Sequence, residues 1–271
     1  MQPATALQTT LCLAALILGM LVALAACSTA PPLSAPTADA WLALVRGGAF
    51  SHRTIFKPGS GSRLHVYIEG DGRPWVTPRS IARDPTPRSP LLTRLMAADP
   101  APALYLGRPC YFDTGDAACD DAKWWTSHRY AAEVVDSLHQ ALAGYAHRYE
   151  SLVLIGHSGG GTLAYLMSTQ RDDVAALVTL AGNLNVSLWT QRHGYTPLTG
   201  SLDPAQRPAL KDSIKQRHYR GTQDERISPA MITSVTGHQP NARYIEIEGA
   251  DHSCCWTSHW PQILQDLAAG R

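Results

Sequence analysis

Residues 152–162 read Leu-Val-Leu-Ile-Gly-His-Ser-Gly-Gly-Gly-Thr, and this stretch decides the fold. The four consecutive apolar residues at its start predict a strand that is buried on both faces. A helix is predicted to follow from Thr162 to Thr169. Between the two lies a glycine-rich turn with Ser158 at its centre.

The turn has the pattern Gly-x-Ser-x-Gly. Small residues two positions on either side of Ser158 let the backbones of strand and helix pass without Cβ clashes. Such a turn lifts the hydroxyl clear of the sheet and directs the helix N-terminus toward it. The pattern therefore indicates a nucleophilic serine. The alternative is a glycine-rich connection without activity.

Around this stretch, short apolar runs alternate with longer amphipathic ones, which predicts an α/β fold with a mostly parallel sheet. Strands are predicted at 63–69, 103–106, 152–155, 175–180, 215–220 and 244–247, and helices at 90–98, 130–149, 162–169, 229–236 and 262–269. Only the segment 182–212 breaks the rhythm, with prolines at 197, 204 and 208. We expect it to form a small lid above the carboxyl edge of the sheet, where ligands bind.

From about residue 60 to its end, the chain resembles the α/β-hydrolases through this strand–serine–helix motif. A narrower resemblance is to uncharacterised bacterial α/β-hydrolase lipoproteins. It rests on Gly107-Arg-Pro-Cys110, Trp125-Thr-Ser-His-Arg-Tyr130 and Asp251-His-Ser-Cys-Cys-Trp256. The resemblance implies the α/β-hydrolase fold, in which helices flank the sheet, but it implies no substrate.

A serine hydroxyl is a poor nucleophile near neutral pH, so Ser158 needs a general base. In this fold the catalytic groups follow the chain order serine, acid, histidine. Among the 11 histidines, His252 lies between the last predicted strand and the last predicted helix, where the fold places its base. His238 precedes that strand and His259 lies in a helical context, so both are weaker candidates. His157 is adjacent to the serine and is expected to support the turn.

The acid of such a triad holds the histidine in the correct tautomer. It should lie on the loop after the preceding strand, and Gly221-Thr-Gln-Asp224-Glu225-Arg226-Ile227 follows the strand predicted at 215–220. The chain between this loop and His252 has room for one helix and one strand. We therefore expect Asp224 to be the acid, with Glu225 as the adjacent alternative.

The developing oxyanion also needs N–H donors. One is expected to be the backbone amide of Gly159, the residue after the nucleophile. The other comes from the loop after the early strand, Glu69-Gly70-Asp71-Gly72, where the amide of Asp71 is the expected donor. A carboxylate beside an oxyanion is unfavourable unless it is turned away or paired, and Arg73 is a candidate partner.

Together these residues predict a serine hydrolase that transfers the acyl group of a small-molecule substrate to water. Ser158 would attack the carbonyl, His252 would carry the proton and Asp224 would orient His252. A carboxylesterase or lipase-like enzyme is expected, without a metal or organic cofactor. Amidases, peptidases and thioesterases use the same groups and remain alternatives. A non-catalytic envelope protein that keeps the fold for binding is another.

The composition fits one large globular domain, since 45% of the 271 residues are hydrophobic. The 23 Lys and Arg residues nearly balance the 22 Asp and Glu residues, and the net charge is +1. This balance, without a Lys/Arg block, gives no reason to expect nucleic acid as a partner. Nothing in the sequence indicates an oligomeric state.

The N-terminal segment has the pattern of an export signal. Leu11–Ala26 is apolar but shorter than the roughly 20 residues that a transmembrane helix needs. Leu24-Ala25-Ala26-Cys27 resembles the bacterial lipobox, in which the cysteine is lipidated and becomes the first mature residue. We therefore predict a signal peptide over 1–26 and a lipid anchor at Cys27 that holds the chain on a membrane.

Ser28, after the cysteine, resembles outer-membrane sorting signals, so the chain is expected on the outer membrane of a bacterial envelope, facing the periplasm. In contrast to most signal peptides, no Lys or Arg precedes Arg46. The alternative is an ordinary cleaved signal and a secreted or periplasmic protein. A Pro/Ser/Ala-rich tether is predicted over 27–40, followed by the hydrolase domain over 41–271.

Export would place the other cysteines in an oxidising compartment, where Cys110, Cys119, Cys254 and Cys255 permit three pairings. A disulfide between Cys110 and Cys119 would close a short loop and is the one we favour. A bond between the neighbours Cys254 and Cys255 is strained and disfavoured, and cross-pairing stays open.

One group of metal-ligand types occurs near the C-terminus. It consists of Asp251, His252, Cys254, Cys255 and His259. Its spacing matches no familiar zinc pattern, and the expected compartment favours disulfides. No metal site is therefore expected.

Overall fold

The computed structural model describes residues 33–88 and 91–269. The predicted signal peptide at 1–26, Cys27 and the first part of the predicted tether lie outside the described residues. The sheet and the hydrophobic core belong to one compact unit, Pro32–Arg271, which therefore has what a domain needs to fold by itself. Among the described residues, no helix is long and apolar enough to cross a membrane.

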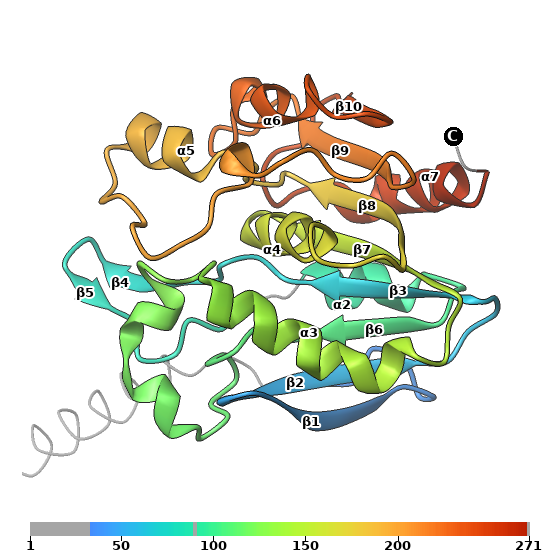
Figure 1. Ribbon diagram of the computed structural model, residues 1–271, viewed down its shortest axis with the longest axis horizontal. Helices are drawn as coiled ribbons and strands as arrows, with labels where there is room; N and C mark the ends of the chain where they lie inside the picture. Colours follow the sequence, from blue (N-terminus) through green and yellow to red (C-terminus); the bar gives the residue numbers. More distant parts are fainter. Residues whose placement is uncertain (1–32, 89–90, 270–271) are drawn as a thin grey trace, which may run out of the picture. The chain divides into compact units, whose positions relative to one another are not determined.

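An eight-stranded sheet lies at the centre of this unit (Figure 1), in the order β1-β2-β6-β3-β7-β8-β9-β10. The strands are β1 (Trp41–Gly47), β2 (Phe50–Lys57), β3 (Arg63–Ile68), β6 (Ala103–Leu106), β7 (Ser151–His157), β8 (Val174–Leu180), β9 (Lys215–Gly221) and β10 (Ala242–Ile247). All neighbouring strands from β6 to β10 are parallel, while β2 is antiparallel to both β1 and β6. The prediction of a mostly parallel sheet is confirmed.

Helices cover both faces of the sheet. Helices α2 (Leu91–Ala97) and α7 (Trp256–Ala268) contact each other on one face, and α3 (Ala132–Ala146) and α4 (Gly159–Ser168) contact each other on the opposite face (Figure 1). Helix α6 (Pro229–Thr236) contacts β10. Layers of this kind bury the apolar runs of the central strands on both sides.

Each predicted strand and helix has a counterpart in the structure, but the last helix begins at Trp256 rather than at 262. Its buried residues are Trp256, Trp260 and Ile263, which share one helical face. The additional turn matters for the site, because it brings the helix close behind His252.

Two hairpins and one helix were not predicted. The first hairpin, β1–β2, adds an antiparallel edge to the sheet. The second consists of β4 (Trp75–Thr77) and β5 (Ser80–Ile81), whose residues are all exposed and therefore carry no pattern of burial. The segment 182–212, predicted as a lid, contains α5 (Val186–His193) and the short 3-10 helix η3 (Pro204–Gln206).

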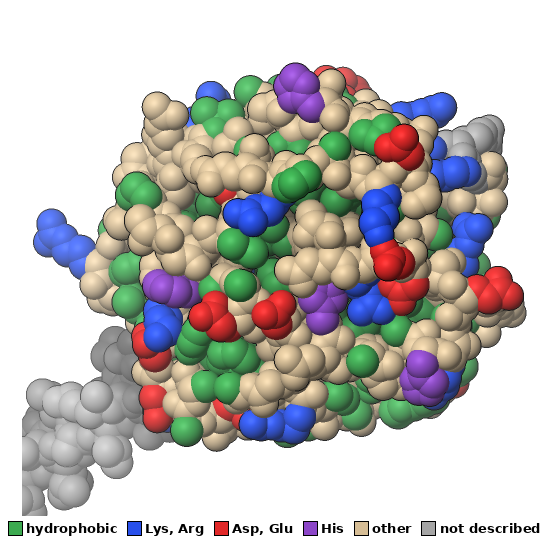
Figure 2. Space-filling view, in the orientation of Figure 1, with side chains coloured by type: hydrophobic (Ala, Val, Ile, Leu, Met, Phe, Trp, Pro, Cys, Tyr) green, Lys and Arg blue, Asp and Glu red, His purple; other side chains and the backbone are tan. Residues whose placement is uncertain are grey.

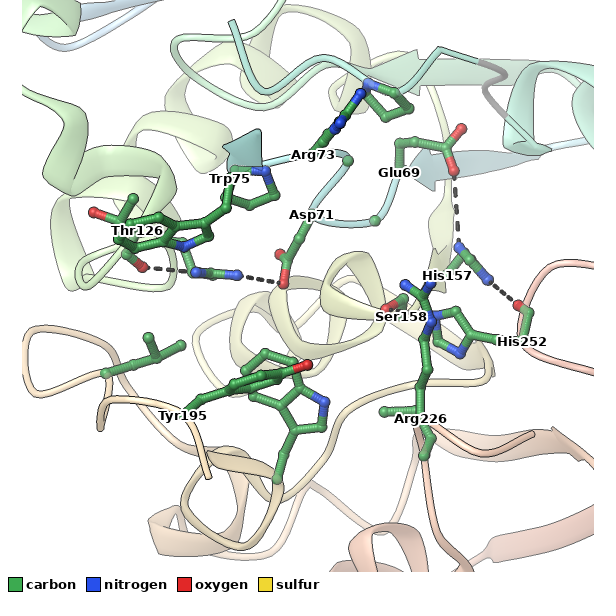
Figure 3. Close-up of a pocket in the computed structure, with 18 of the residues that line it drawn as sticks. Glu69, Asp71, Arg73, Trp75, Thr126, His157, Ser158, Tyr195, Arg226 and His252 are labelled. Atoms are coloured by element: carbon green, nitrogen blue, oxygen red, sulfur yellow. Dashed lines mark hydrogen bonds and ion pairs between the residues drawn. The ribbon is translucent and has the colours of Figure 1, made fainter. Parts of the chain in front are cut away.

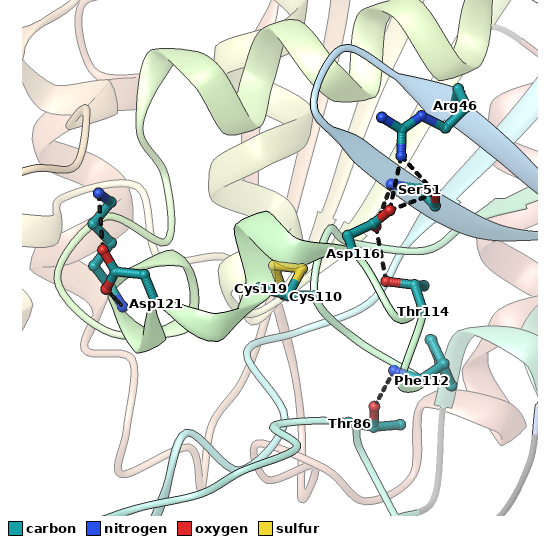
Figure 4. Close-up of a disulfide and its surroundings, with 10 residues drawn as sticks. Arg46, Ser51, Thr86, Cys110, Phe112, Thr114, Asp116, Cys119 and Asp121 are labelled. Atoms are coloured by element: carbon teal, nitrogen blue, oxygen red, sulfur yellow. Dashed lines mark hydrogen bonds and ion pairs between the residues drawn. A yellow bond between two sulfur atoms is a disulfide. The ribbon is translucent and has the colours of Figure 1, made fainter.

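A disulfide loop lies between β6 and α3. Cys110 and Cys119 are bonded, with Cα atoms 5.2 Å apart, and the loop includes the 3-10 helix η1 (Ala117–Asp120) (Figure 4). A second 3-10 helix, η2 (Ala122–Trp125), follows. The carboxylate of Asp116 accepts hydrogen bonds from the amide of Ser51 at 2.6 Å and from Arg46 at 2.8 Å (Figure 4). These bonds tie the loop to the β1–β2 hairpin.

At the turn from β7 into α4, the backbone of the helix packs directly against the backbones of β7 and β3. A methyl group on Gly156 would lie 2.3 Å from the carbonyl oxygen of Gly160, and one on Gly160 would lie 1.9 Å from the carbonyl oxygen of Ile68 in β3. Both contacts are with backbone atoms, which cannot move aside without shifting a strand or a helix. Glycine is therefore required at both positions for α4 to begin directly against the sheet.

We expect Gly156→Ala to lower the free energy of unfolding by about 2 kcal/mol or more, because the added methyl group overlaps the backbone of α4. The matched control is Gly144→Ala in the exposed part of α3, where a methyl group would meet nothing within 4 Å. This control should raise the free energy of unfolding by about 0.5–1 kcal/mol, since alanine favours the helix. Urea unfolding measures the free energy of unfolding of both variants. Equal values for the two would contradict the close packing of Gly156 against the backbone of α4.

Candidate active site

Ser158 lies in the turn between β7 and α4, as the sequence predicted. Its backbone has φ 53° and ψ −121°, a conformation that L-residues rarely adopt. The close packing of Gly156 against Gly160 keeps the backbone of Ser158 in this strained conformation. As a result the half-buried side chain of Ser158 stands at the N-terminus of α4 and lines a cavity.

His252 and Asp224 lie in line with this serine. His252 Nε2 is 3.1 Å from Ser158 Oγ, and His252 Nδ1 is 3.0 Å from Asp224 Oδ2. Since a carboxylate accepts, Nδ1 donates to Asp224 and Nε2 is left to accept the serine hydroxyl. Figure 3 shows Ser158 and His252 facing each other at one end of the cavity. The structure thus brings together all three residues that the sequence singled out, whereas Glu225 is exposed.

The loop after β9 holds the side chain of Asp224, which is fully buried. Its Oδ1 accepts hydrogen bonds from the amides of Arg226 at 2.8 Å and Ile227 at 3.0 Å. Burial alone would raise the pKa of Asp224, but the hydrogen bonds from His252 and these amides outweigh burial and lower the pKa. The carboxylate is therefore ionised and can stabilise a protonated His252.

Arg220 of β9 fixes the backbone of the same loop. Its guanidinium donates to the carbonyl oxygens of Asp224 at 2.7 Å and Ile227 at 2.6 Å. This arginine was not predicted, because a charged residue at the end of a strand carries no signal of its own, even next to the loop of Asp224.

His157 supports the loop of His252 rather than the reaction itself. Its Nε2 lies 2.8 Å from the carbonyl oxygen of His252, to which it must donate, and Trp256 Nε1 donates to the same oxygen at 3.2 Å. Burial, together with the nearby ring of His252, lowers the pKa of His157 to about 4. The ring is thus neutral near pH 7 and acts as a fixed donor, but it supports the loop of His252, whereas the sequence had led us to expect it to support the turn at Ser158.

The two expected oxyanion donors lie side by side. A methyl group on Gly70 would lie 3.3 Å from Ser158 Cβ, and one on Gly159 would lie 2.1 Å from Asp71 Oδ1. The loop after β3 therefore contacts the start of α4. Within the described part of the chain, the amides of Gly159 and Asp71 donate to no other residue. Both are available to an oxyanion.

The carboxylate of Asp71 is paired, but not with Arg73. It accepts hydrogen bonds from Arg108 at 2.5 Å, from Tyr130 at 2.6 Å and from Arg129 at 3.0 Å. Arg73 donates instead to the carbonyl oxygen of Val76. The candidate partner named from the sequence was therefore wrong, because it was chosen for its proximity along the chain.

Two buried guanidinium groups outweigh the charge of Asp71. Burial alone would raise the pKa of this carboxyl, yet Arg108 and Arg129 hold it well below its usual range. Two positive charges beside one negative charge leave this side of the oxyanion site with a positive excess. The carboxylate of Asp71 would therefore not repel an oxyanion bound at this place.

Like Arg220, the three partners of Asp71 had no predicted role; they are Arg108, Arg129 and Tyr130. They belong to Gly107-Arg-Pro-Cys110 and Trp125-Thr-Ser-His-Arg-Tyr130, two of the motifs on which the narrower resemblance rests. These motifs lie on either side of the disulfide loop and meet at Asp71. The motifs could be recognised in the sequence, but only the folded chain shows that both contact the carboxylate of Asp71.

Ser158 opens into a cavity of about 820 Å³. One wall of the cavity is aromatic and apolar, with Trp75 from the β4–β5 hairpin and Trp189, Tyr195 and Leu198 from the segment 182–212 (Figure 3). The segment predicted as a lid thus lies over the site and supplies much of this wall.

Glu69 is a buried carboxyl at the bottom of the cavity. Its Oε2 accepts a hydrogen bond from the amide of Leu92 at 3.0 Å, and its Oε1 lies 3.9 Å from His157 Nδ1. Burial raises the pKa of Glu69 to about 7, against the opposing effect of the backbone hydrogen bonds. Near neutral pH this carboxyl is therefore partly protonated.

Four of the five residues of metal-ligand types near the C-terminus make other contacts in the structure. His252 faces Ser158 and Asp224, Asp251 accepts from the amides of Ser253 and Cys254, and Cys254 is bonded to Cys255. The sequence disfavoured a bond between these neighbouring cysteines, and that prediction was wrong. Cys255 has a φ of 76°, so the chain reverses there before α7 begins.

The raised pKa of Glu69 predicts how stability depends on pH. The folded chain keeps a proton that the unfolded chain, with a pKa near 4.5, releases. The contribution of Glu69 is therefore complete below pH 4.5 and is lost as the pH rises through about 7, a change of about 3 kcal/mol. Glu69→Gln removes this loss, so its stability relative to the wild type should increase between about pH 5 and about pH 8.

Urea unfolding at several pH values measures this difference. Exposed Glu133→Gln controls for the change in net charge. A difference between Glu69→Gln and the wild type that stays constant with pH, or that decreases as the pH rises, would contradict the protonated state of Glu69.

No protein-family model matches the chain, and no curated protein matches its sequence. Solved structures do match it. A puromycin-hydrolyzing peptidase from Mycobacterium tuberculosis superposes with a TM-score of 0.60 at 13% identity, over 88% of this chain. The chain spans 39% of the length of that peptidase.

Two further structures match over nearly their whole length. An esterase from Pyrococcus furiosus has a TM-score of 0.62 at 9% identity, with 89% of this chain and 96% of the esterase covered. The mouse alpha/beta hydrolase domain-containing protein 10 has a TM-score of 0.60 at 13% identity, with coverages of 84% and 97%. The strand order, the turn at Ser158 and these similarities agree: the chain has the α/β-hydrolase fold.

Proposed function

We propose that this chain is a serine hydrolase that transfers the acyl group of a carboxylic ester to water. The observation that carries the proposal is the hydrogen-bonded line from Ser158 Oγ through His252 to Asp224, with distances of 3.1 Å and 3.0 Å. Nucleophile, base and orienting acid stand in the order that this chemistry requires.

In the first half of the reaction, Ser158 Oγ attacks the carbonyl carbon while His252 Nε2 accepts its proton. The ionised Asp224 stabilises the imidazolium that forms. The amides of Gly159 and Asp71 donate to the oxyanion, aided by the dipole of α4. Collapse of the tetrahedral intermediate expels the alcohol, which takes the proton from His252, and leaves an acyl group on Ser158. A water activated by His252 then releases the acid.

The cavity supports an apolar acyl group. Trp75, Trp189, Tyr195 and Leu198 offer an apolar wall next to the nucleophile, in a volume of about 820 Å³ that fits a small-molecule ester. The similar structures include an esterase and a peptidase, so an amide remains the main competing substrate. In the same proposal, lipidation of Cys27 would hold the enzyme in the bacterial cell envelope.

Ser158→Ala should abolish labelling of the purified protein by a fluorophosphonate probe and lower ester turnover by roughly 1000-fold or more. Ser253→Ala, which removes another hydroxyl beside the same cavity, should keep the label. Gel fluorescence and the release of p-nitrophenol measure the two effects. Labelling that persists in Ser158→Ala would assign the nucleophile elsewhere.

Matched p-nitrophenyl esters and p-nitroanilides with the same acyl groups would separate an esterase from an amidase. Faster hydrolysis of the esters, with a preference for apolar acyl chains, is expected from the aromatic wall. A preference for the anilides would replace the ester in the proposal by an amide and leave the triad in place.

Asp224→Asn should lower kcat by about 1000-fold or more, because an amide no longer fixes the correct tautomer of His252. Glu225→Gln changes the same charge one residue further along the chain and should retain most of the activity, since Glu225 is exposed. Steady-state kinetics on one ester compares them. If Glu225→Gln were the inactive variant, the acid would be misassigned.

A further inference from the structure

Seven large apolar side chains of the described residues are exposed, and they form two groups. Trp41, Leu42 and Leu44 belong to the edge strand β1. The others lie on the β4–β5 hairpin and in the segment after α5, with exposed fractions of 42% for Trp75, 52% for Val76, 44% for Ile81 and 54% for Tyr195. Trp75 and Tyr195 also line the cavity itself, and Figure 3 shows both across the cavity from His252.

Exposed arginines accompany the apolar side chains of the hairpin. Residues 72–88, which include the β4–β5 hairpin, contain four arginines and a single acidic residue. The arginines are Arg73, Arg79, Arg83 and Arg88, and all are exposed. The acidic residue, Asp84, is only partly exposed and accepts hydrogen bonds from the amide and the hydroxyl of Thr86. The hairpin therefore presents a positive excess.

We use the name mouth rim for Trp75, Val76, Ile81 and Tyr195 together with Arg73, Arg79 and Arg83. In Figure 1 the β4–β5 hairpin projects at the left beside the segment that follows α5. Figure 2 shows a basic side chain projecting at the same margin beside hydrophobic ones, with acidic side chains lower on that margin.

We propose that the mouth rim docks on an anionic lipid bilayer. Tryptophan and tyrosine are favoured at the level of lipid headgroups. Apolar side chains of this size gain free energy when they enter the acyl boundary, and arginines around them are attracted to lipid phosphates. The positive excess of residues 72–88 complements a negatively charged surface. A neutral bilayer or a neutral protein partner would gain no attraction from these charges.

The other exposed apolar group does not fit this role. Trp41 packs against Phe56 with ring centroids 4.6 Å apart, and Leu42 and Leu44 lie on the same edge strand. Nothing on β1 links this group to the cavity. It serves below as a control of similar apolarity.

Docking at the mouth rim would orient the cavity toward the bilayer, so that an acyl chain could pass from the membrane past Trp75 and Tyr195 to Ser158. Binding itself needs no triad. The proposal therefore goes beyond the proposed hydrolysis, and either one can fail without the other.

The test uses the chain from Pro32 to Arg271, the compact unit that contains the whole core, so that no signal or lipid contributes. Flotation compares vesicles of equal parts phosphatidylglycerol and phosphatidylcholine with vesicles of phosphatidylcholine alone. The wild type is expected to float with the anionic vesicles and to lose this binding at an ionic strength of about 1 M, where screening is nearly complete. Ser158→Ala should float equally.

Two pairs of variants locate the surface. Arg79→Gln with Arg83→Gln should lower the partition coefficient roughly 25-fold, or about fivefold per arginine, whereas Arg63→Gln with Arg243→Gln should have little effect. Val76→Ser with Ile81→Ser should lower it roughly tenfold, unlike Leu42→Ser with Leu44→Ser on β1. Thermal unfolding of every variant checks that it is folded.

Three results would overturn the proposal. The first is equal flotation with neutral and anionic vesicles, or none with either. The second is a loss in the control pairs as large as in the mouth-rim pairs. The third is a dimer, seen by sedimentation velocity, that dissociates in Val76→Ser with Ile81→Ser, because the surface would then join two copies of the chain.

Discussion

The reversal of the chain at Ser158 is the constraint on which the site depends. A serine with φ 53° can be held only if the strand before it and the helix after it pack without intervening side chains, as Gly156 and Gly160 allow. The same packing places the amide of Gly159 beside the loop after β3. The positions of Ser158 and of the two amides proposed as oxyanion donors are thus consequences of one backbone crossing.

The other groups are brought to this crossing by loops at the carboxyl edge of the sheet, as is usual for open α/β sheets. Arg220 and two amides fix the loop of Asp224, while His157 and Trp256 fix the carbonyl oxygen of His252. Asp71 is fixed by two arginines from the two sides of the disulfide loop. Neutral or charge-compensated groups thus surround Ser158, and in the proposed reaction negative charge would develop next to donors that are already in place.

Much of the fold and the positions of the three aligned residues could be predicted from the sequence, because each rests on a local pattern. Buried strands such as 152–155 are continuous apolar runs, and Asp224 and His252 each follow a strand in the expected order. The β4–β5 hairpin was missed because exposed strands of two or three residues leave no such pattern. The partners of Asp71 were missed because Arg108 and Arg129 are distant along the chain and meet it only through tertiary packing.

The central claim is that the acyl group passes through Ser158, and the most direct measurement is the mass of the intermediate. The wild type is mixed with a p-nitrophenyl ester, quenched in acid during turnover and analysed by intact mass and peptide mapping. We expect one acyl group per chain, on the peptide that contains Ser158, formed with a matching burst of p-nitrophenol. Turnover without any acylated chain, or acylation at another residue, would contradict the account.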